Sequence, residues 1–353
     1  MPNDLIVPYR VDVPQSALDD LAERLDRAKL DEVGAERLDG LLDRWRDGYD
    51  WRVWESRINA HPQFTTEIDG LDVHFLHVRS PRPDAFPLIL SHGWPGSVVE
   101  FLDLLVPLAA DFHLVVPSLP GFGFSGPADG WDRHRTARAW AELMRRLGYD
   151  RYGAVGNDLG STVSLELGRT AADHVTGVLV TQIFSMPAGA DEPLTEDDAD
   201  RLAHSQRFIQ RHGAYLRLHA TRPDLLAPAL TDSPVGLAAW NAQLLDAVDP
   251  DFALTNITLY WLTGTGASSI RFYAHDARAV HPTTPTTTPV ALSEYTGDYF
   301  RSVRRYASRD HSAIVSWTTH PGGGHFAAHQ APDALLNDIR AFFEVYGDRT
   351  PRP

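Results

Sequence analysis

Gly156-Asn157-Asp158-Leu159-Gly160-Ser161 is the stretch of sequence that decides the fold of this chain. Residues 151–155 before it are predicted to form a short strand, and residues 161–170 after it a helix. The small residues at 156, 160 and 161 favour a sharp strand–turn–helix, because the chain has no room there for branched side chains. A turn of this kind is a nucleophile elbow, which presents a reactive side chain at its apex. Asp158 occupies that apex.

The aspartate narrows the chemistry that this turn could support. Most elbows carry serine, which attacks a carbonyl carbon, whereas a carboxylate suits an sp³ carbon that bears a leaving group. Attack there produces an alkyl ester, whose own carbonyl water can then hydrolyse. Epoxides, alkyl halides and close relatives are the substrates that fit these two steps. The alternative is an ordinary surface turn that happens to contain an aspartate, so the rest of the chain must support the interpretation.

Two further motifs flank the elbow in an informative order. Upstream, an apolar run at 88–90 leads into His92-Gly93-Trp94-Pro95-Gly96-Ser97, where an α/β-hydrolase keeps its second oxyanion-hole donor. Downstream, residues 289–292 are predicted to form a strand, and Asp298 follows it. His325 lies on a glycine-rich loop before a predicted helix at 331–346. The chain order is therefore nucleophile, acid and base, which is the order that the α/β-hydrolase fold uses.

Composition and charge favour an enzyme that acts on small molecules. The chain has 353 residues, enough for one large core with an inserted cap. Its net charge of −15 argues against nucleic acid or an anionic membrane as a partner, because both attract basic surfaces. The absence of cysteine excludes disulfides, thiolate metal sites and thiol nucleophiles. The first residues lack a signal-peptide pattern and no apolar run approaches about 18 residues, so we expect a cytoplasmic protein without a membrane anchor.

The pattern of elements divides the chain into three parts. Residues 1–69 are predicted to be helix-rich, with a helix over 16–30 that Ser16 caps. Strands and helices alternate over 70–184 and again over 276–353, which favours a core with a mostly parallel sheet covered on both faces. Residues 185–275 are helical and aromatic, as a lid inserted between two strands would be. The Pro/Thr-rich segment 282–289 is predicted to be an irregular connector.

The chain resembles the microsomal-type epoxide hydrolases, the branch that includes juvenile-hormone and many bacterial epoxide hydrolases. The resemblance covers nearly all of the sequence. It implies an α/β-hydrolase fold in which residues 1–69 form a meander that wraps the catalytic core. It rests on YDWR at 49–52, PQF at 62–64, HVRS at 77–80, HGWPGS at 92–97, PGFGFS at 120–125, DSPVGLAAW at 232–240, residues 256–273 and GGHFAA at 323–328.

The resemblance assigns the opening of an epoxide ring to three residues. Asp158 would attack a ring carbon, while two lid tyrosines, matched here by Tyr215 and Tyr273, would protonate the departing oxygen. A phenol is neutral at pH 7, so it can donate without first being protonated. Without the family match, both tyrosines would be interpreted as aromatic side chains that pack the lid.

The resemblance assigns the hydrolysis of the resulting ester to His325. This histidine would activate water, with Asp298 orienting the imidazole, and the backbone N–H groups of Trp94 and Leu159 would stabilise the oxyanion. The Trp94–Pro95 bond is expected to be cis, as it is in relatives. Glu294 is an alternative acid, although the turn at 295–297 and the family's spacing to His325 favour Asp298.

No cofactor or metal is expected. His325 and His329 are spaced like a metal pair on a helix, but the chain has no H-E-x-x-H pattern there and no evident third ligand. Two positions depart from the family, because Leu159 replaces the usual Trp and His219 stands where Gln is common. We expect both replacements to alter substrate preference, and neither removes a catalytic group.

Two other functions fit parts of the sequence. A haloalkane dehalogenase also uses an aspartate elbow, but it holds the halide with indole N–H groups, one of them from the residue after the nucleophile, and Leu159 has none. A non-catalytic protein that binds a small apolar ligand could keep the fold, although nucleophile, base and acid all stand here. The sequence therefore predicts an enzyme that converts an apolar epoxide and water to a vicinal diol. It does not identify the epoxide, and the chain could form a homodimer.

Overall fold

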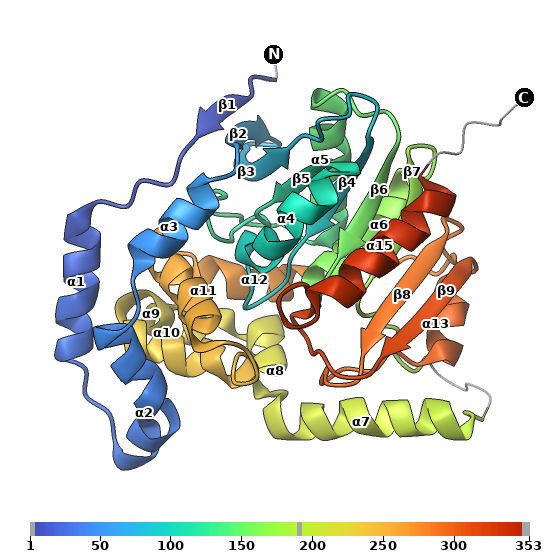
Figure 1. The fold of residues 1–353 in the computed structure, drawn as a ribbon. Coiled ribbons are helices and arrows are strands. Elements are labelled where there is room, and N and C mark those ends of the chain that lie inside the picture. The colour runs from blue at the N-terminus through green and yellow to red at the C-terminus, as the bar shows by residue number, and fades with distance from the viewer. Residues whose placement is uncertain (1–3, 189–192, 348–353) are drawn as a thin grey trace, which may run out of the picture.

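A nine-stranded mixed sheet forms the centre of the computed structural model, which describes residues 4–188 and 193–347 (Figure 1). The strands are β1 (Val7–Tyr9), β2 (Gln63–Ile68), β3 (Leu71–Val78), β4 (Phe86–Ser91), β5 (Phe112–Pro117), β6 (Tyr152–Gly156), β7 (Val175–Val180), β8 (Val290–Tyr295) and β9 (Ile314–His320). Their order across the sheet is β1-β2-β3-β5-β4-β6-β7-β8-β9. The pairs from β1 to β5 are antiparallel and those from β5 to β9 are parallel, so the predicted mostly parallel sheet is confirmed.

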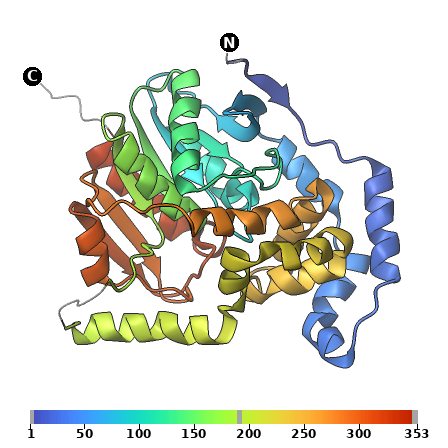
Figure 2. The same cartoon turned by 180° about the vertical axis from the view of Figure 1, so that it is seen from behind.

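Helices cover both faces of the parallel part of this sheet. On one face lie α4 (Leu102–Ala109), which follows the short helix η1 (Val98–Phe101), and α15 (Pro332–Tyr346) (Figure 1). On the other face lie α5 (Arg133–Arg146) and α6 (Leu159–Thr170), as the view from behind shows (Figure 2). The strands β5, β6 and β7 are buried along their whole length, because both of their faces are covered. Two shorter helices, α13 (Arg304–Asp310) and α14 (Ala327–Gln330), flank β9 in the chain.

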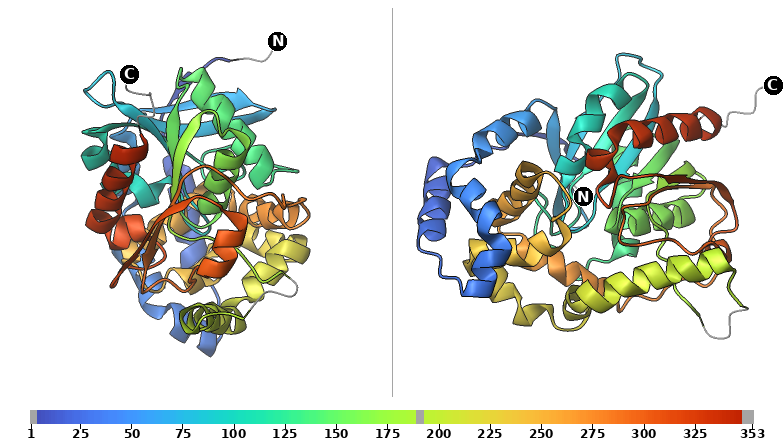
Figure 3. Two further views of the ribbon diagram at one scale, coloured as in Figure 1. Left: turned by 90° about the vertical axis from the view of Figure 1, so that its right-hand side faces the viewer. Right: turned by 60° about the horizontal axis from the view of Figure 1, so that its bottom comes forward.

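The segment between β7 and β8 is helical, as the sequence predicts. Helices α8 to α12 cluster together, whereas α7 extends away from the cluster toward the β8–β9 side of the sheet (Figures 1 and 3). The connector 282–289 that follows contains no helix or strand, and all of it lies in the described part of the chain. The helices are α7 (Glu196–His212), α8 (Ala214–Thr221), η2 (Pro223–Leu225), α9 (Ala227–Asp232), α10 (Pro234–Asn241), η3 (Ala242–Leu244), α11 (Pro250–Thr263) and α12 (Gly266–Asp276).

The N-terminal segment contributes to two parts of the molecule. Its helices are α1 (Gln15–Asp26), α2 (Glu32–Asp47) and α3 (Trp51–Asn59), and they pack on the lid helices α10 and α11. Its strands β1 and β2 extend the central sheet, and β2 forms a hairpin with β3. The proposed boundary at residue 69 therefore lies inside a hairpin, and the division of the chain into three domains stays a prediction.

The prediction that Ser16 caps the first helix is wrong. Helix α1 begins at Gln15 and ends at Asp26, and Pro14 precedes it with φ −62° and ψ 142°. Proline is suited to a helix start, because its fixed φ matches the helix and it has no N–H to leave unbonded. Ser16 thus lies within the first turn rather than before it.

Candidate active site

Asp158 lies at a tight turn between β6 and α6, where the sequence places the elbow. Its backbone has φ 52° and ψ −120°, a conformation that is rare for a residue with a side chain. The neighbouring Gly160 permits the turn, because a Cβ there would collide with the carbonyl oxygen of Ser91 at the end of β4. The side chain of Asp158 is 14% exposed. The elbow thus places a largely buried carboxylate at the edge of the sheet where the parallel strands have their carboxyl ends.

Two backbone N–H groups hold this carboxylate. Trp94 donates its N–H to Asp158 Oδ1 over 3.0 Å, and Leu159 also donates a backbone hydrogen bond to the carboxylate. The Trp94–Pro95 peptide bond is cis, as expected. Burial raises the pKa of Asp158 above its ordinary value, although the nearby His325 and the two N–H groups oppose the rise. The two donors lie where the sequence predicts an oxyanion hole.

His325 lies between two carboxylates and is almost fully buried. Its Nε2 is 3.6 Å from Asp158 Oδ2, and its Nδ1 is 3.2 Å from Asp298 Oδ1. Burial alone lowers the pKa of His325, but the two carboxylates outweigh it, so the net pKa is raised. Gly297 lets the two loops meet, because a Cβ there would collide with the carbonyl oxygen of Gly323. The structure therefore brings the predicted nucleophile, base and acid together.

Glu294, the alternative acid, lies in a separate hydrogen-bond network. It is 1% exposed, and its Oε2 accepts a bond from Arg201 of α7 over 2.5 Å. The same carboxylate also accepts from the backbone N–H of Ser302 and the hydroxyl of Thr319. Of the two candidates, Asp298 is the one that contacts His325.

The two lid tyrosines both contact the side chain of Trp94. Tyr215 of α8 stacks on Trp94 at 5.2 Å between ring centroids, and Tyr273 of α12 contacts the same indole edge-on at 6.2 Å. The two phenol rings are 6.5 Å apart. Burial raises the pKa of both phenols well above 10, and the nearby Asp158 adds to the rise. Both phenols are therefore protonated at neutral pH and lie near Asp158.

His219 completes this aromatic cluster. It is fully buried, accepts a hydrogen bond from the Trp240 indole N–H over 2.8 Å, and contacts Tyr273 edge-on at 5.0 Å. Burial lowers its pKa to about 3, so the imidazole is neutral. The replacement of glutamine by histidine thus adds a flat, uncharged ring to the wall that holds the tyrosines.

His329, which is spaced from His325 like the second ligand of a metal pair, does not contact Asp158, Asp298 or the lid tyrosines in the interactions that the structure shows. It stacks on Phe252 and its Nδ1 is 3.8 Å from Asp103 Oδ2. Among residues 4–188 and 193–347, no group of three or more histidine, aspartate or glutamate side chains is arranged to hold a metal ion.

Comparisons with known proteins show which family the chain belongs to. Residues 6–101 match the family described as epoxide hydrolase N terminus, and residues 87–286 match the alpha/beta hydrolase fold family. A Stigmatella aurantiaca protein, named only provisionally as an epoxide hydrolase, is 38% identical over 96% of this chain and 84% of its own length. The structure of Aspergillus niger epoxide hydrolase superimposes with a TM-score of 0.86 at 32% identity, and the match covers 98% of this chain and 97% of that one. The chain belongs to the epoxide hydrolase family.

Mammalian members are more distant relatives of this epoxide hydrolase. Epoxide hydrolase 1 of Oryctolagus cuniculus is 29% identical to it over 96% of this chain and 89% of the rabbit protein. In the described ranges of the present chain, no helix combines the length and apolar character needed to cross a membrane. The α/β-hydrolase fold predicted from the sequence is confirmed for this epoxide hydrolase.

Sequence reasoning missed Gln182, which follows β7 and is fully buried. Its Oε1 accepts the backbone N–H of Asp158 over 2.8 Å, and its Nε2 donates to Asp298 Oδ2 over 2.6 Å. One amide side chain therefore links Asp158 to Asp298 in this epoxide hydrolase. The available signal was a polar residue at the carboxyl end of the apolar run 175–180, beside the strand that carries the elbow.

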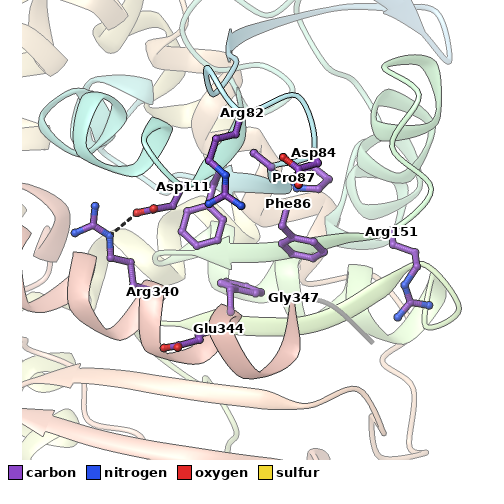
Figure 4. A pocket seen from close by; sticks show the side chains of 12 residues that line it. Arg82, Asp84, Phe86, Pro87, Asp111, Arg151, Arg340, Glu344 and Gly347 are labelled. Atoms are coloured by element: carbon purple, nitrogen blue, oxygen red, sulfur yellow. Dashed lines mark hydrogen bonds and ion pairs between the residues drawn. The ribbon is translucent and has the colours of Figure 1, made fainter. Parts of the chain in front are cut away.

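A pocket of this epoxide hydrolase lies at the opposite ends of the strands, where β4 and β5 begin (Figure 4). Arg82, Asp111 and Arg340 line it, and Arg340 Nε donates to Asp111 Oδ2 over 2.8 Å. Open parallel sheets bind their ligands at the carboxyl ends of the strands, where Asp158 and His325 lie. The charged pocket is therefore separate from the candidate site.

Two isosteric substitutions distinguish the acids of this epoxide hydrolase. Asp298→Asn is expected to reduce turnover on the order of 10³- to 10⁴-fold, because an amide cannot hold His325 in the tautomer that accepts a proton. Glu294→Gln is expected to keep most of the turnover but to lower the free energy of unfolding by roughly 3 kcal/mol, because Arg201 loses its buried carboxylate partner and keeps only the exposed Asp197. Turnover and urea unfolding of both variants check this, and the reverse pattern would make Glu294 the acid.

Proposed function

We propose that this epoxide hydrolase converts an apolar epoxide to a vicinal diol through a covalent ester on Asp158. The observation that carries the proposal is the position of the Asp158 carboxylate. Its Oδ1 is bound by the N–H of Trp94, and its Oδ2 faces His325 Nε2 at 3.6 Å. Oδ2 is thus the oxygen left to attack, and Oδ1 becomes the carbonyl oxygen of the ester.

In the first step, Asp158 Oδ2 attacks a carbon of the epoxide ring. A C–O bond forms, the ring C–O bond breaks, and its electron pair stays on the departing oxygen. Tyr215 or Tyr273 donates a proton to that oxygen, which becomes a hydroxyl. A poor leaving group such as an alkoxide needs this assistance, and general acids typically contribute roughly 10²- to 10⁴-fold.

In the second step, water attacks the carbonyl carbon of the ester. His325 Nε2 takes a proton from the water, and Asp298 stabilises the imidazolium that results. The N–H groups of Trp94 and Leu159 stabilise the charge that develops on Oδ1. Collapse of the intermediate breaks the bond between the carbonyl carbon and the alkyl oxygen, which takes the proton held by His325 and leaves as a hydroxyl of the diol. The carboxylic acid that remains returns its proton to the tyrosine that donated one in the first step, which restores both the Asp158 carboxylate and the phenol. Each step uses side chains of this protein and water.

Parallel assays with styrene oxide and a haloalkane test the proposed reaction. We expect diol to form from the epoxide and no halide to be released, because the leaving group faces phenols and Leu159 supplies no indole N–H. Release of halide without diol would instead identify a dehalogenase. Binding of both compounds without turnover would identify a ligand-binding protein.

A further inference from the structure

Tyr299 lies one residue beyond the proposed acid and stacks on the proposed base. The centroids of the Tyr299 and His325 rings are 4.2 Å apart, with 23° between the ring planes. The Tyr299 hydroxyl is buried and has no hydrogen-bond partner in the described part of the chain. The contact of Tyr299 with His325 is therefore made by the face of its ring, and no hydrogen bond of its hydroxyl competes with the stack.

A side chain of the lid stacks on the other face of the Tyr299 ring. Phe208 of α7 stacks on Tyr299 at 4.2 Å with only 12° between the planes. Tyr299 is thus the middle ring of a stack formed by Phe208, Tyr299 and His325. Through this stack, a helix inserted between β7 and β8 contacts the proposed base.

Helix α7 is docked along the loop that carries Asp298 and Tyr299. His204 Nε2 bonds to the carbonyl oxygen of Asp298 over 2.8 Å, and the Ser205 hydroxyl accepts the backbone N–H of Arg301 over 2.9 Å. One turn earlier, Arg201 forms its buried ion pair with Glu294. The contacts of α7 recur at the spacing of one helix turn, so one face of α7 fixes this loop.

We propose that Tyr299 is a positioning residue for His325, clamped by Phe208 of α7, and that it serves hydrolysis of the ester rather than its formation. The inference rests on the proposed two-step function. A flat ring stacked on the imidazole limits rotation of His325 away from Asp158. The electron-rich face of a phenol also attracts a cation, so the stack favours the imidazolium that forms when His325 accepts a proton.

The charged groups that face His325 decide whether its protonated or its neutral form is favoured. Asp158 faces its Nε2 and Asp298 faces its Nδ1, and both favour the protonated ring, as the Tyr299 stack does. From α7, His204 reaches the backbone of Asp298, while Arg201 is paired with Glu294. Phe326, the remaining ring against the imidazole, is uncharged. Tyr215 and Tyr273 lie near the Tyr299 hydroxyl, and burial keeps all three phenols neutral.

Three variants test the role of this stack, with alkylation and ester hydrolysis measured separately by rapid-quench mass spectrometry across pH. Tyr299→Leu removes the aromatic face but keeps the imidazole covered. We expect its maximal hydrolysis rate to fall roughly tenfold or more. The acid limb of hydrolysis should move to lower pH by about half a unit, because the neutral imidazole is the active form and the imidazolium has lost support. Alkylation should stay within about twofold of the wild-type rate.

Two matched variants distinguish the effect of the Tyr299 ring from the effect of its hydroxyl and from a general loss of folding. Tyr299→Phe keeps the stack and should retain the wild-type pH midpoint. Phe208→Leu loosens the clamp from its far side and should give a smaller change in the same direction. An unchanged hydrolysis step in Tyr299→Leu overturns the inference, and so does slower alkylation in Tyr299→Phe, which would make the phenol a proton donor. If the wild-type protein forms no ester, the proposed function itself fails, which is a different result.

Discussion

Asp158→Ala is expected to form no diol, and His325→Gln is expected to accumulate an ester on Asp158. The first variant lacks the attacking oxygen. The second keeps the proposed nucleophile and the proposed proton donors, but it lacks the proposed base for water, and loss of a general base costs roughly 10²- to 10⁴-fold. The rate of ester formation therefore exceeds the rate of its breakdown, and the intermediate should be trapped.

Intact-protein mass spectrometry after incubation of His325→Gln with an epoxide measures the trapped species. Ring opening expels no fragment, so the protein should gain the full mass of the epoxide, and peptide mapping should place the addition on Asp158. A haloalkane would instead add its mass less that of the hydrogen halide. His329→Gln is the matched control, since His329 contacts Asp103 and not the site, and it should carry no adduct. A folded His325→Gln protein that binds substrate without gaining mass would contradict the two-step mechanism.

Replacing both lid tyrosines by phenylalanine is expected to slow alkylation on the order of 10⁴-fold, whereas each single change should be partial. The two phenols contact the same Trp94 ring and lie 6.5 Å apart, so either can assist when the other is lost. Their pKa values are raised well above 10 by burial, which keeps the proton on each phenol until the alkoxide develops. Only ring opening creates an alkoxide, so hydrolysis of a preformed ester should change little.

Pre-steady-state kinetics of Tyr215→Phe, Tyr273→Phe and the double variant resolve the two steps. Tyr49→Phe is the control for loss of a buried phenol, because the Tyr49 hydroxyl bonds Thr255 Oγ1 between the N-terminal segment and the lid. If the double variant alkylates Asp158 at nearly the wild-type rate, both tyrosines are packing residues and the proton donor must be sought elsewhere in the lid.

Local sequence was sufficient to predict the structure of a segment wherever steric contacts or solvation restrict the residue type that the segment can carry. The glycine pattern around Asp158 predicts the elbow, because a Cβ at Gly160 collides with the neighbouring strand whatever the rest of the chain does. The strand predicted before the elbow at 151–155 is confirmed as β6. The start of α1 was predicted less well, because both Ser16 and Pro14 are acceptable near a helix start and the choice between them is a matter of small energies.

The sequence by itself determined the fold class, and it predicts Asp158, Asp298 and His325 as nucleophile, acid and base in that order along the chain. These depend on residue type and on chain direction, since parallel strands present their carboxyl ends at one edge. Only the tertiary structure decided that Asp298 rather than Glu294 contacts His325, that Gln182 joins Asp158 to Asp298, and that Tyr299 stacks on the imidazole. Each of these contacts joins residues from segments far apart in the chain or depends on how a loop turns. They arise from the packing of α7 and the loops at the carboxyl ends of the strands, which no local pattern encodes.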